Sequence, residues 1–176
     1  LHDRFTNEVL RRAKPSKMID LGCGFGKSAR PFYRDAPDIQ LTAVDLSAPC
    51  LRVAALNARD DGARSVLFAQ RDAADTGFES GSFDTVTSTM LLHEVSPPHL
   101  ERLVEESFRL LEDGGTVVHL DFLVPEDQPF KRFIHYTHGR RNNEPFMEPL
   151  NEMDIAEMHR KAGFREVEII PFEEAA

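Results

Sequence analysis

Residues 18–26 read Met-Ile-Asp-Leu-Gly-Cys-Gly-Phe-Gly, and this stretch says most about the fold. A short apolar run ends in three glycines at alternate positions, and residues 27–34 then have the composition of a helix. Glycine is needed where a backbone turns sharply and passes within contact distance of a ligand, because a Cβ would collide there. The segment therefore predicts a strand, a ligand-holding loop and a helix in succession.

The spacing of the three glycines separates several kinds of nucleotide-binding loop. A phosphate loop of the form GxxxxGK[ST] needs glycine at position 21, which is Leu21 here. A dinucleotide loop, GxGxxG, needs glycine at position 27, which is Lys27. The spacing found, GxGxG, can wrap a sulfonium nucleoside and requires no pyrophosphate at the helix end. A tight turn without any ligand is the alternative.

The rest of the chain alternates short β-rich runs with helical segments. We expect strands at residues 17–21, 39–46, 65–70, 83–89, 116–123 and 166–172, and helices at residues 2–13, 27–34, 49–60, 99–111 and 151–162. This alternation predicts an α/β fold, a three-layer sandwich with a mostly parallel central sheet. Residues 124–150 contain four prolines, and we expect a substrate-side lid or insertion there, within a single domain over 1–176. A solvated loop stiffened by proline is the other interpretation.

Composition narrows the expected partners. Thirty acidic against 21 basic residues give a net charge of −9, which disfavours nucleic acid. No apolar run reaches the roughly 18–20 residues of a membrane span, so no membrane partner is expected. Two cysteines, Cys23 and Cys50, suggest a reducing compartment and a cytoplasmic location. Because the chain begins at Leu1 without an initiator Met, we expect further sequence upstream.

Five motifs in order resemble those of the class I S-adenosylmethionine-dependent methyltransferases, over residues 17–123. They are residues 20–26 (DLGCGFG), 42–47 (TAVDLS), 70–74 (QRDAA), 78–89 (FESGSFDTVTST) and 111–116 (LEDGGT). The resemblance implies a Rossmann-like fold, S-adenosyl-L-methionine as cofactor, and methyl transfer to oxygen, nitrogen or carbon of a small molecule. A noncatalytic S-adenosylmethionine-binding or interaction protein on the same fold is the alternative. A nicotinamide oxidoreductase is disfavoured by Lys27.

The same resemblance implies roles for the cofactor-binding residues. Asp45 would accept both ribose hydroxyls, and Leu46 would pack on the adenine. Asp72 would accept the adenine amino group, the Ala73 N–H would reach a ring nitrogen, and Thr89 would lie beside the methionine portion. The glycine loop supplies the remaining candidates, Asp20, Gly22, Cys23, Gly24 and Gly26. Taken alone, Asp45 also fits a helix N-cap or surface acid, and Asp72 fits a solvated turn.

His93 and Glu94 follow the fourth strand and are the candidate catalytic residues. His93 can act as a general base near neutral pH, and Glu94 can orient it or bind a polar substrate group. The alternative is that both residues cap or pack the start of a helix. Asp121 lies on the fifth strand near its ligand-side end and is a candidate substrate contact, together with three residues of the lid, His138, Asn143 and Phe146. No ligand spacing supports a metal held by His93, Glu94 and Asp121, so no metal is expected.

The chain departs from the family at two places. The family's sheet has seven strands, whereas only six are expected here, so the seventh is missing from the sequence or another segment covers that edge. An unpaired edge invites pairing, and a homodimer is therefore among the expected partners. The Asp/Asn-Pro-Pro-Tyr motif of DNA amino-methylating enzymes is missing after the fourth strand, where residues 96–99 read Ser-Pro-Pro-His. This further disfavours a nucleic-acid substrate.

Overall fold

A computed structural model describes residues 1–124 and 127–171. The strands are β1 (Lys17–Leu21), β2 (Gln40–Asp45), β3 (Val66–Gln70), β4 (Phe83–Thr89) and β5 (Leu111–Leu120). The helices are α1 (His2–Arg12), α2 (Ala29–Asp35), α3 (Ala48–Asp60), α4 (Pro97–Leu110), α5 (Pro129–Asn142), α6 (Met147–Glu152) and α7 (Ile155–Ala162), with a single 3-10 turn, η1 (Leu92–Glu94).

The five strands form one parallel sheet in the order β3-β2-β1-β4-β5. The chain builds outward from β1 in one direction through β2 and β3, and then crosses to the other side of β1 for β4 and β5. β1 and β4 are therefore neighbours, with Leu21 opposite Ser88. Ligands of such sheets bind beyond the carboxyl ends of the strands where the order reverses. This topology brings the glycine loop after β1 next to the segment that follows β4.

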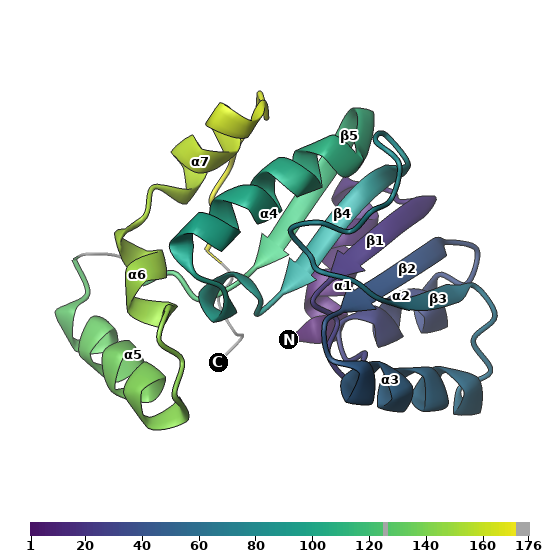
Figure 1. The fold of residues 1–176 in the computed structure, drawn as a ribbon, viewed down its shortest axis with the longest axis horizontal. Coiled ribbons are helices and arrows are strands. Elements are labelled where there is room, and N and C mark those ends of the chain that lie inside the picture. Colours follow the sequence, from purple (N-terminus) through teal and green to yellow (C-terminus); the bar gives the residue numbers. More distant parts are fainter. Residues whose placement is uncertain (125–126, 172–176) are drawn as a thin grey trace.

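Alternating side chains of the strands fill two cores, one on each face of the sheet. Met18 packs with Phe32 of α2 in the core beneath α1, α2 and α3. Ile19 and Leu21 point the other way, into the core that contains Leu110 of α4. Figure 1 shows α4 and α7 covering one face and α1 and α2 on the other. The three-layer α/β sandwich predicted from the sequence is confirmed.

The predicted lid folds into two helices, α5 and α6. Figure 1 shows them apart from the body of the sheet, on the side toward which β4 and β5 point. Helix α5 buries little besides Gly139, whereas α6 buries Met147 and Leu150. The solvated-loop interpretation of residues 124–150 is therefore wrong for the described part of this segment. No helix within the described ranges has the combination of length and apolar composition that crossing a bilayer requires.

Two expectations near the end of the chain are wrong. The predicted strand at 166–172 is irregular over residues 166–171, and Phe172 lies outside the described residues. In the described part of the chain, β5 therefore pairs with β4 alone. The helix predicted at 151–162 begins only at Ile155, because Asp154 is the residue that caps it, accepting from the Glu157 N–H at 2.8 Å. Asn151 belongs instead to the end of α6.

Helix α7 packs against α4 and β5 through a partly buried group of aromatic and histidine rings. Phe164 meets Phe108 of α4 edge to face, with ring centroids 5.1 Å apart. His159 of α7 packs against His119 of β5, with ring centroids 5.3 Å apart. The His119 Nδ1 lies 2.7 Å from the Ser88 hydroxyl. Burial, with a smaller effect of His159, lowers the pKa of His119 to about 3. His119 is thus neutral in the folded protein near neutral pH.

We predict that His119 makes the fold acid-sensitive. The unfolded chain takes up a proton at His119 near its ordinary pKa of 6.5, whereas the folded chain does so only at about 3. Its contribution to the free energy of unfolding therefore falls as the pH drops through 6.5, by about 2 kcal/mol between pH 7 and pH 5. Urea unfolding of wild type and His119→Asn checks this. The difference between the two should change by that amount over this range, and a pH-independent difference would contradict the prediction.

Candidate active site

The glycine loop after β1 has three residues with positive φ. They are Gly22 (+67°), Gly24 (+52°) and Gly26 (+79°). A Cβ on Gly22 would lie 2.6 Å from Leu91 Cδ1, and one on Gly26 would lie 2.9 Å from Ala54 Cβ. A Cβ on Gly24 would meet nothing within 4 Å. Packing and conformation thus require glycine at positions 22 and 26, whereas at position 24 the bare backbone borders open space.

Asp45, at the end of β2, holds this loop in place. Its Oδ2 accepts from the Gly24 N–H at 2.8 Å, and its Oδ1 accepts from the Ser47 N–H at 2.8 Å. The N-cap of α3 is Ser47, so the helix-cap alternative for Asp45 is wrong. The carboxylate is only half-buried, and the Leu46 side chain beside it is 63% exposed. An apolar side chain in that position offers a surface to a flat, apolar ring.

Asp20 fixes the glycine loop from inside the core. It is completely buried, and its carboxylate accepts from the Ser28 hydroxyl at 2.5 Å and the Thr87 hydroxyl at 3.0 Å. Burial raises the pKa of Asp20 to about 6, against the opposing effect of these two hydrogen bonds. The expectation of direct cofactor binding is corrected here, because the carboxylate links the loop to β4 and has no exposed surface. It is a positioning residue.

Four further cofactor candidates lie on or near the loops that follow β1, β3 and β4. Cys23 is buried, its N–H donates to the Val44 carbonyl at 2.9 Å, and burial raises the pKa of its thiol. Thr89 ends β4 with a buried hydroxyl that has no hydrogen-bond partner in the described structure. Asp72 lies in the loop after β3, where Oδ1 accepts from the Ala74 N–H at 2.9 Å and faces His99 Nε2 at 3.0 Å. Ala73 is half-buried beside it.

The backbone reverses abruptly where β4 ends. Met90 has φ +56°, an uncommon conformation for a residue with a side chain, while its N–H still donates to the Leu120 carbonyl at 2.8 Å. Strained backbone of this kind is concentrated at functional sites. The turn directs the chain into η1 and so places His93 at the switch point of the sheet.

Asp121 directly follows β5, which ends at Leu120 and not at residue 123 as predicted, and it binds η1. Its Oδ1 lies 2.6 Å from His93 Nδ1, and its Oδ2 accepts from the Leu92 N–H at 2.7 Å. Its side chain is 3% exposed. The expectation that Asp121 contacts substrate is therefore corrected, because this carboxylate is buried and occupied by η1. It fixes the tautomer of His93 with the proton on Nδ1, which leaves Nε2 as the acceptor.

Carboxylates surround His93 on several sides. The Glu94 carboxylate lies 3.7 Å from His93 Nε2, and Glu144, in the turn between α5 and α6, has an oxygen within 4.8 Å of the cluster. Burial lowers the pKa of His93, but the hydrogen bond and charge of Asp121, with Glu94 and Glu144, outweigh it. The pKa of His93 therefore lies above its ordinary value. His135 of α5 also faces this cluster, and burial lowers its pKa.

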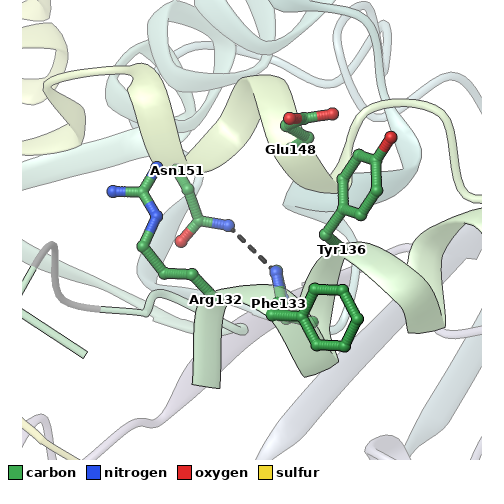
Figure 2. Close-up of a pocket in the computed structure, with 6 residues that line it drawn as sticks. Arg132, Phe133, Tyr136, Glu148 and Asn151 are labelled. Carbon is green, nitrogen blue, oxygen red and sulfur yellow. Dashed lines mark hydrogen bonds between the residues drawn. The ribbon is translucent and has the colours of Figure 1, made fainter. Parts of the chain in front are cut away.

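Two adjoining pockets open between α5 and α6. Figure 2 shows the first, about 320 Å³, with Arg132, Phe133 and Tyr136 of α5 facing Glu148 and Asn151 of α6. The Asn151 amide lies 3.2 Å from His135 Nδ1 and joins the two helices. The second pocket, about 340 Å³, includes Glu144 in its lining.

The predicted substrate contacts of the lid are dispersed. His138 is exposed near the end of α5 and lies 2.8 Å from the Asn142 amide. Asn143 is exposed, has φ +58°, and lines the second pocket. Phe146 is half-buried at the start of α6. Sequence reasoning missed Glu144 as a neighbour of His93, because the lid was treated as a loop and its fold back onto η1 has no local signal.

The residues around the glycine loop have the chemistry that S-adenosylmethionine would need. Gly24 leaves its backbone open, Asp45 offers a half-buried carboxylate for a vicinal diol, and Leu46 offers an exposed apolar surface. The Ser28 hydroxyl, at the N-cap of α2, makes no cap hydrogen bond and is turned inward to Asp20.

Comparisons with known proteins agree with this geometry. The profile of a family described as "Methyltransferase domain" matches residues 18–115, more than half of the chain. The ubiquinone/menaquinone biosynthesis C-methyltransferase of Stutzerimonas stutzeri is 31% identical over 134 residues, which are 75% of this chain and 52% of that protein. The chain thus spans about half the length of this curated relative.

Two solved structures extend the similarity beyond the matched region. A Bacillus halodurans protein assigned as a methyltransferase is 26% identical with a TM-score of 0.75, covering 93% of this chain and 70% of that one. Phosphoethanolamine N-methyltransferase 2 of Haemonchus contortus, solved with S-adenosyl-L-methionine, is 25% identical with a TM-score of 0.66, covering 92% and 36%.

We predict that the His93 imidazole titrates above its ordinary value of 6.5 and that Asp121→Asn lowers this pKa. The substitution removes the charge that favours the imidazolium, while Glu94, Glu144 and His135 stay in place. An NMR titration of the His93 ring signals in both proteins measures the two values. A wild-type pKa at or below 6.5, or one that Asp121→Asn leaves unchanged, would contradict the role assigned to this hydrogen bond.

Proposed function

The chain belongs to the methyltransferase-domain family, and on that premise we propose that it binds S-adenosylmethionine at the loop after β1 and transfers the methyl group to a small molecule. The observation that carries this proposal is the open backbone at Gly24, held in position by the Asp45 carboxylate. The names of the similar proteins include both a C- and an N-methyltransferase, so they leave the accepting atom open.

In this proposal the residues at the carboxyl ends of β1 and β2 bind the cofactor. The ribose hydroxyls donate to Asp45, and Leu46 packs on the adenine. When bound, S-adenosylmethionine supplies a methyl group on positively charged sulfur, which makes that carbon electrophilic without further activation. The protein has to align the acceptor, exclude water and, where the acceptor is protonated, remove a proton.

His93 is the residue we propose for proton removal. The side chain is 4% exposed, Asp121 holds Nδ1, and Nε2 accepts no hydrogen bond from the described residues. An imidazole fixed in this way accepts a proton at Nε2, and the charge that develops is stabilised by Asp121. Glu94 is the second proposed catalytic residue, since its carboxylate lies 3.7 Å from that nitrogen. The lid, α5 and α6, would cover the acceptor.

The remaining features of the proposal concern partners and location. We propose no nucleic acid and no membrane partner, consistent with the net charge of −9. The outer edge of β5 has no strand partner in the described ranges, which supports a homodimer through this edge. Cys23 and Cys50 are both free thiols, which supports a cytoplasmic location.

Cofactor binding is tested first at Gly24. We predict that Gly24→Ala weakens binding of S-adenosylhomocysteine by roughly ten- to a hundredfold, because its Cβ enters the ligand's space. Isothermal titration calorimetry measures this affinity. Gly62→Ala is the matched control, since Gly62 also has a positive φ (+75°) and open space around it. Both variants should lose similar folding stability, and equal affinity in Gly24→Ala and the control would contradict the proposed site. Preference for NADH over S-adenosylmethionine would overturn the proposal.

Turnover is tested separately, with a panel of small-molecule acceptors and S-adenosylhomocysteine formation as the readout. His93→Ala should lower the rate by roughly 10²–10⁴-fold while S-adenosylhomocysteine still binds with wild-type affinity. An unchanged rate would remove His93 from the mechanism. Tight binding without turnover of any acceptor would favour a noncatalytic binding protein on this fold.

A further inference from the structure

The surroundings of His93 restrict the kind of acceptor the site can take. His93, Glu94 and Glu144 each place one nitrogen or oxygen atom within 4.8 Å of the other two. Asp121 adds a third carboxylate directly behind the imidazole. η1 supplies two members of this cluster and the turn between α5 and α6 supplies the third, so the lid completes it.

The cluster has more acceptors than donors. Within residues 1–124 and 127–171, the ion pairs of Asp121, Glu94 and Glu144 are with histidines only. Glu144 Oε2 is shielded from solvent and accepts no hydrogen bond there. The nearly buried His93 also has Nε2 without a hydrogen bond, facing the Glu94 carboxylate. An anionic group would be repelled here, whereas a cation that donates hydrogen bonds would satisfy all three groups.

An ammonium group and a metal ion need different separations between the atoms that bind them. Three acceptors placed tetrahedrally around an ammonium nitrogen, each about 2.9 Å from it, lie about 4.7 Å apart. Around a zinc ion, with bonds of about 2.0–2.1 Å, they would lie about 3.4 Å apart. His93 Nε2 and the Glu94 carboxylate are 3.7 Å apart, a value between the two, and every separation in the cluster is below 4.8 Å, so the spacing admits an ammonium group.

We propose that Glu94 and Glu144 bind the ammonium group of an amine acceptor and present its nitrogen to His93 Nε2, so that the reaction is an N-methylation. This inference rests on the function proposed above. Glu144 also lines the 340 Å³ pocket with His135 and Tyr136, which offers space for the rest of a small amine.

The reaction balances with these groups alone. One N–H bond of the ammonium breaks, and its proton passes to His93 Nε2, which leaves a lone pair on the nitrogen. That lone pair forms the bond to the methyl carbon while the carbon–sulfur bond breaks and its electron pair stays on sulfur. The products are S-adenosylhomocysteine and the methylated ammonium, and the proton on His93 is released to solvent.

Ammonium binding is tested with butylammonium chloride on the full chain, with the His93 ring signals followed by NMR in the presence of S-adenosylhomocysteine. We expect a saturable shift in wild type and a dissociation constant about tenfold or more higher in Glu144→Gln. Glu152→Gln is the matched control, an acid-to-amide change on α6 outside the pocket and the cluster. An absent shift in wild type, or equal affinity in Glu144→Gln and wild type, would overturn the proposal.

Two further experiments distinguish an amine site from a metal site and from a site for acceptors without an amine. Zinc chloride that binds wild type stoichiometrically and tightly, but not Glu144→Gln, would identify a metal site and overturn the amine assignment. In the acceptor panel, each amine is paired with its amine-free counterpart. Turnover confined to the amines supports the inference, and turnover confined to the counterparts overturns it. If S-adenosylhomocysteine fails to bind wild type, the proposed function itself fails, and the ammonium titration without nucleoside still reports on Glu144.

Discussion

One carboxylate, that of Asp45, fixes the geometry on which the proposed cofactor site depends. Both of its oxygens accept backbone N–H groups, one from the glycine loop and one from the start of α3. Because the donors belong to the main chain, the loop and the helix are held at a set distance whatever side chains surround them. Asp20 repeats this arrangement inside the core through Ser28 and Thr87. The carboxylates of Asp45 and Asp20 thus fix the glycine loop on two sides. At Gly24 itself, no atom lies within 4 Å of the position that a Cβ would take.

A third carboxylate, that of Asp121, has the corresponding role on the side where we propose that the acceptor binds. Asp121 joins the end of β5 to η1 through a backbone N–H and the His93 ring. The strand order places this pair beside the glycine loop, because β1 and β4 are neighbours. Two hydrogen-bonded groups, Asp45 with the glycine loop and Asp121 with His93, therefore lie side by side where the strand order reverses. The turn between α5 and α6 adds Glu144 to the second of them, so the environment of His93 depends on a segment more than fifty residues further along the chain.

The sequence predicts the features that local chemistry determines. Glycine spacing identified the loop after β1, and the β-branched run at residues 83–89 identified β4 with its observed bounds. The sequence did not predict helix α5. Its apolar side chains, such as Phe130 and Phe133, are exposed and do not form a buried face with helical spacing. The apolar residues Ile169 and Ile170 suggested a strand, yet a strand needs a neighbour, and pairing is a tertiary property. Likewise, alternation placed Asp121 near the ligand side of the sheet but could not reveal His93 as its partner.

The central claim is that a nucleoside lies over Gly24 with its sugar on Asp45. A crystal structure of the complex with S-adenosylhomocysteine tests it most directly. The account predicts that both ribose hydroxyls lie within hydrogen-bond distance of the Asp45 carboxylate, with the adenine against Leu46 and the sulfur toward His93. A nucleoside bound elsewhere, or a ribose that leaves Asp45 untouched, would contradict it.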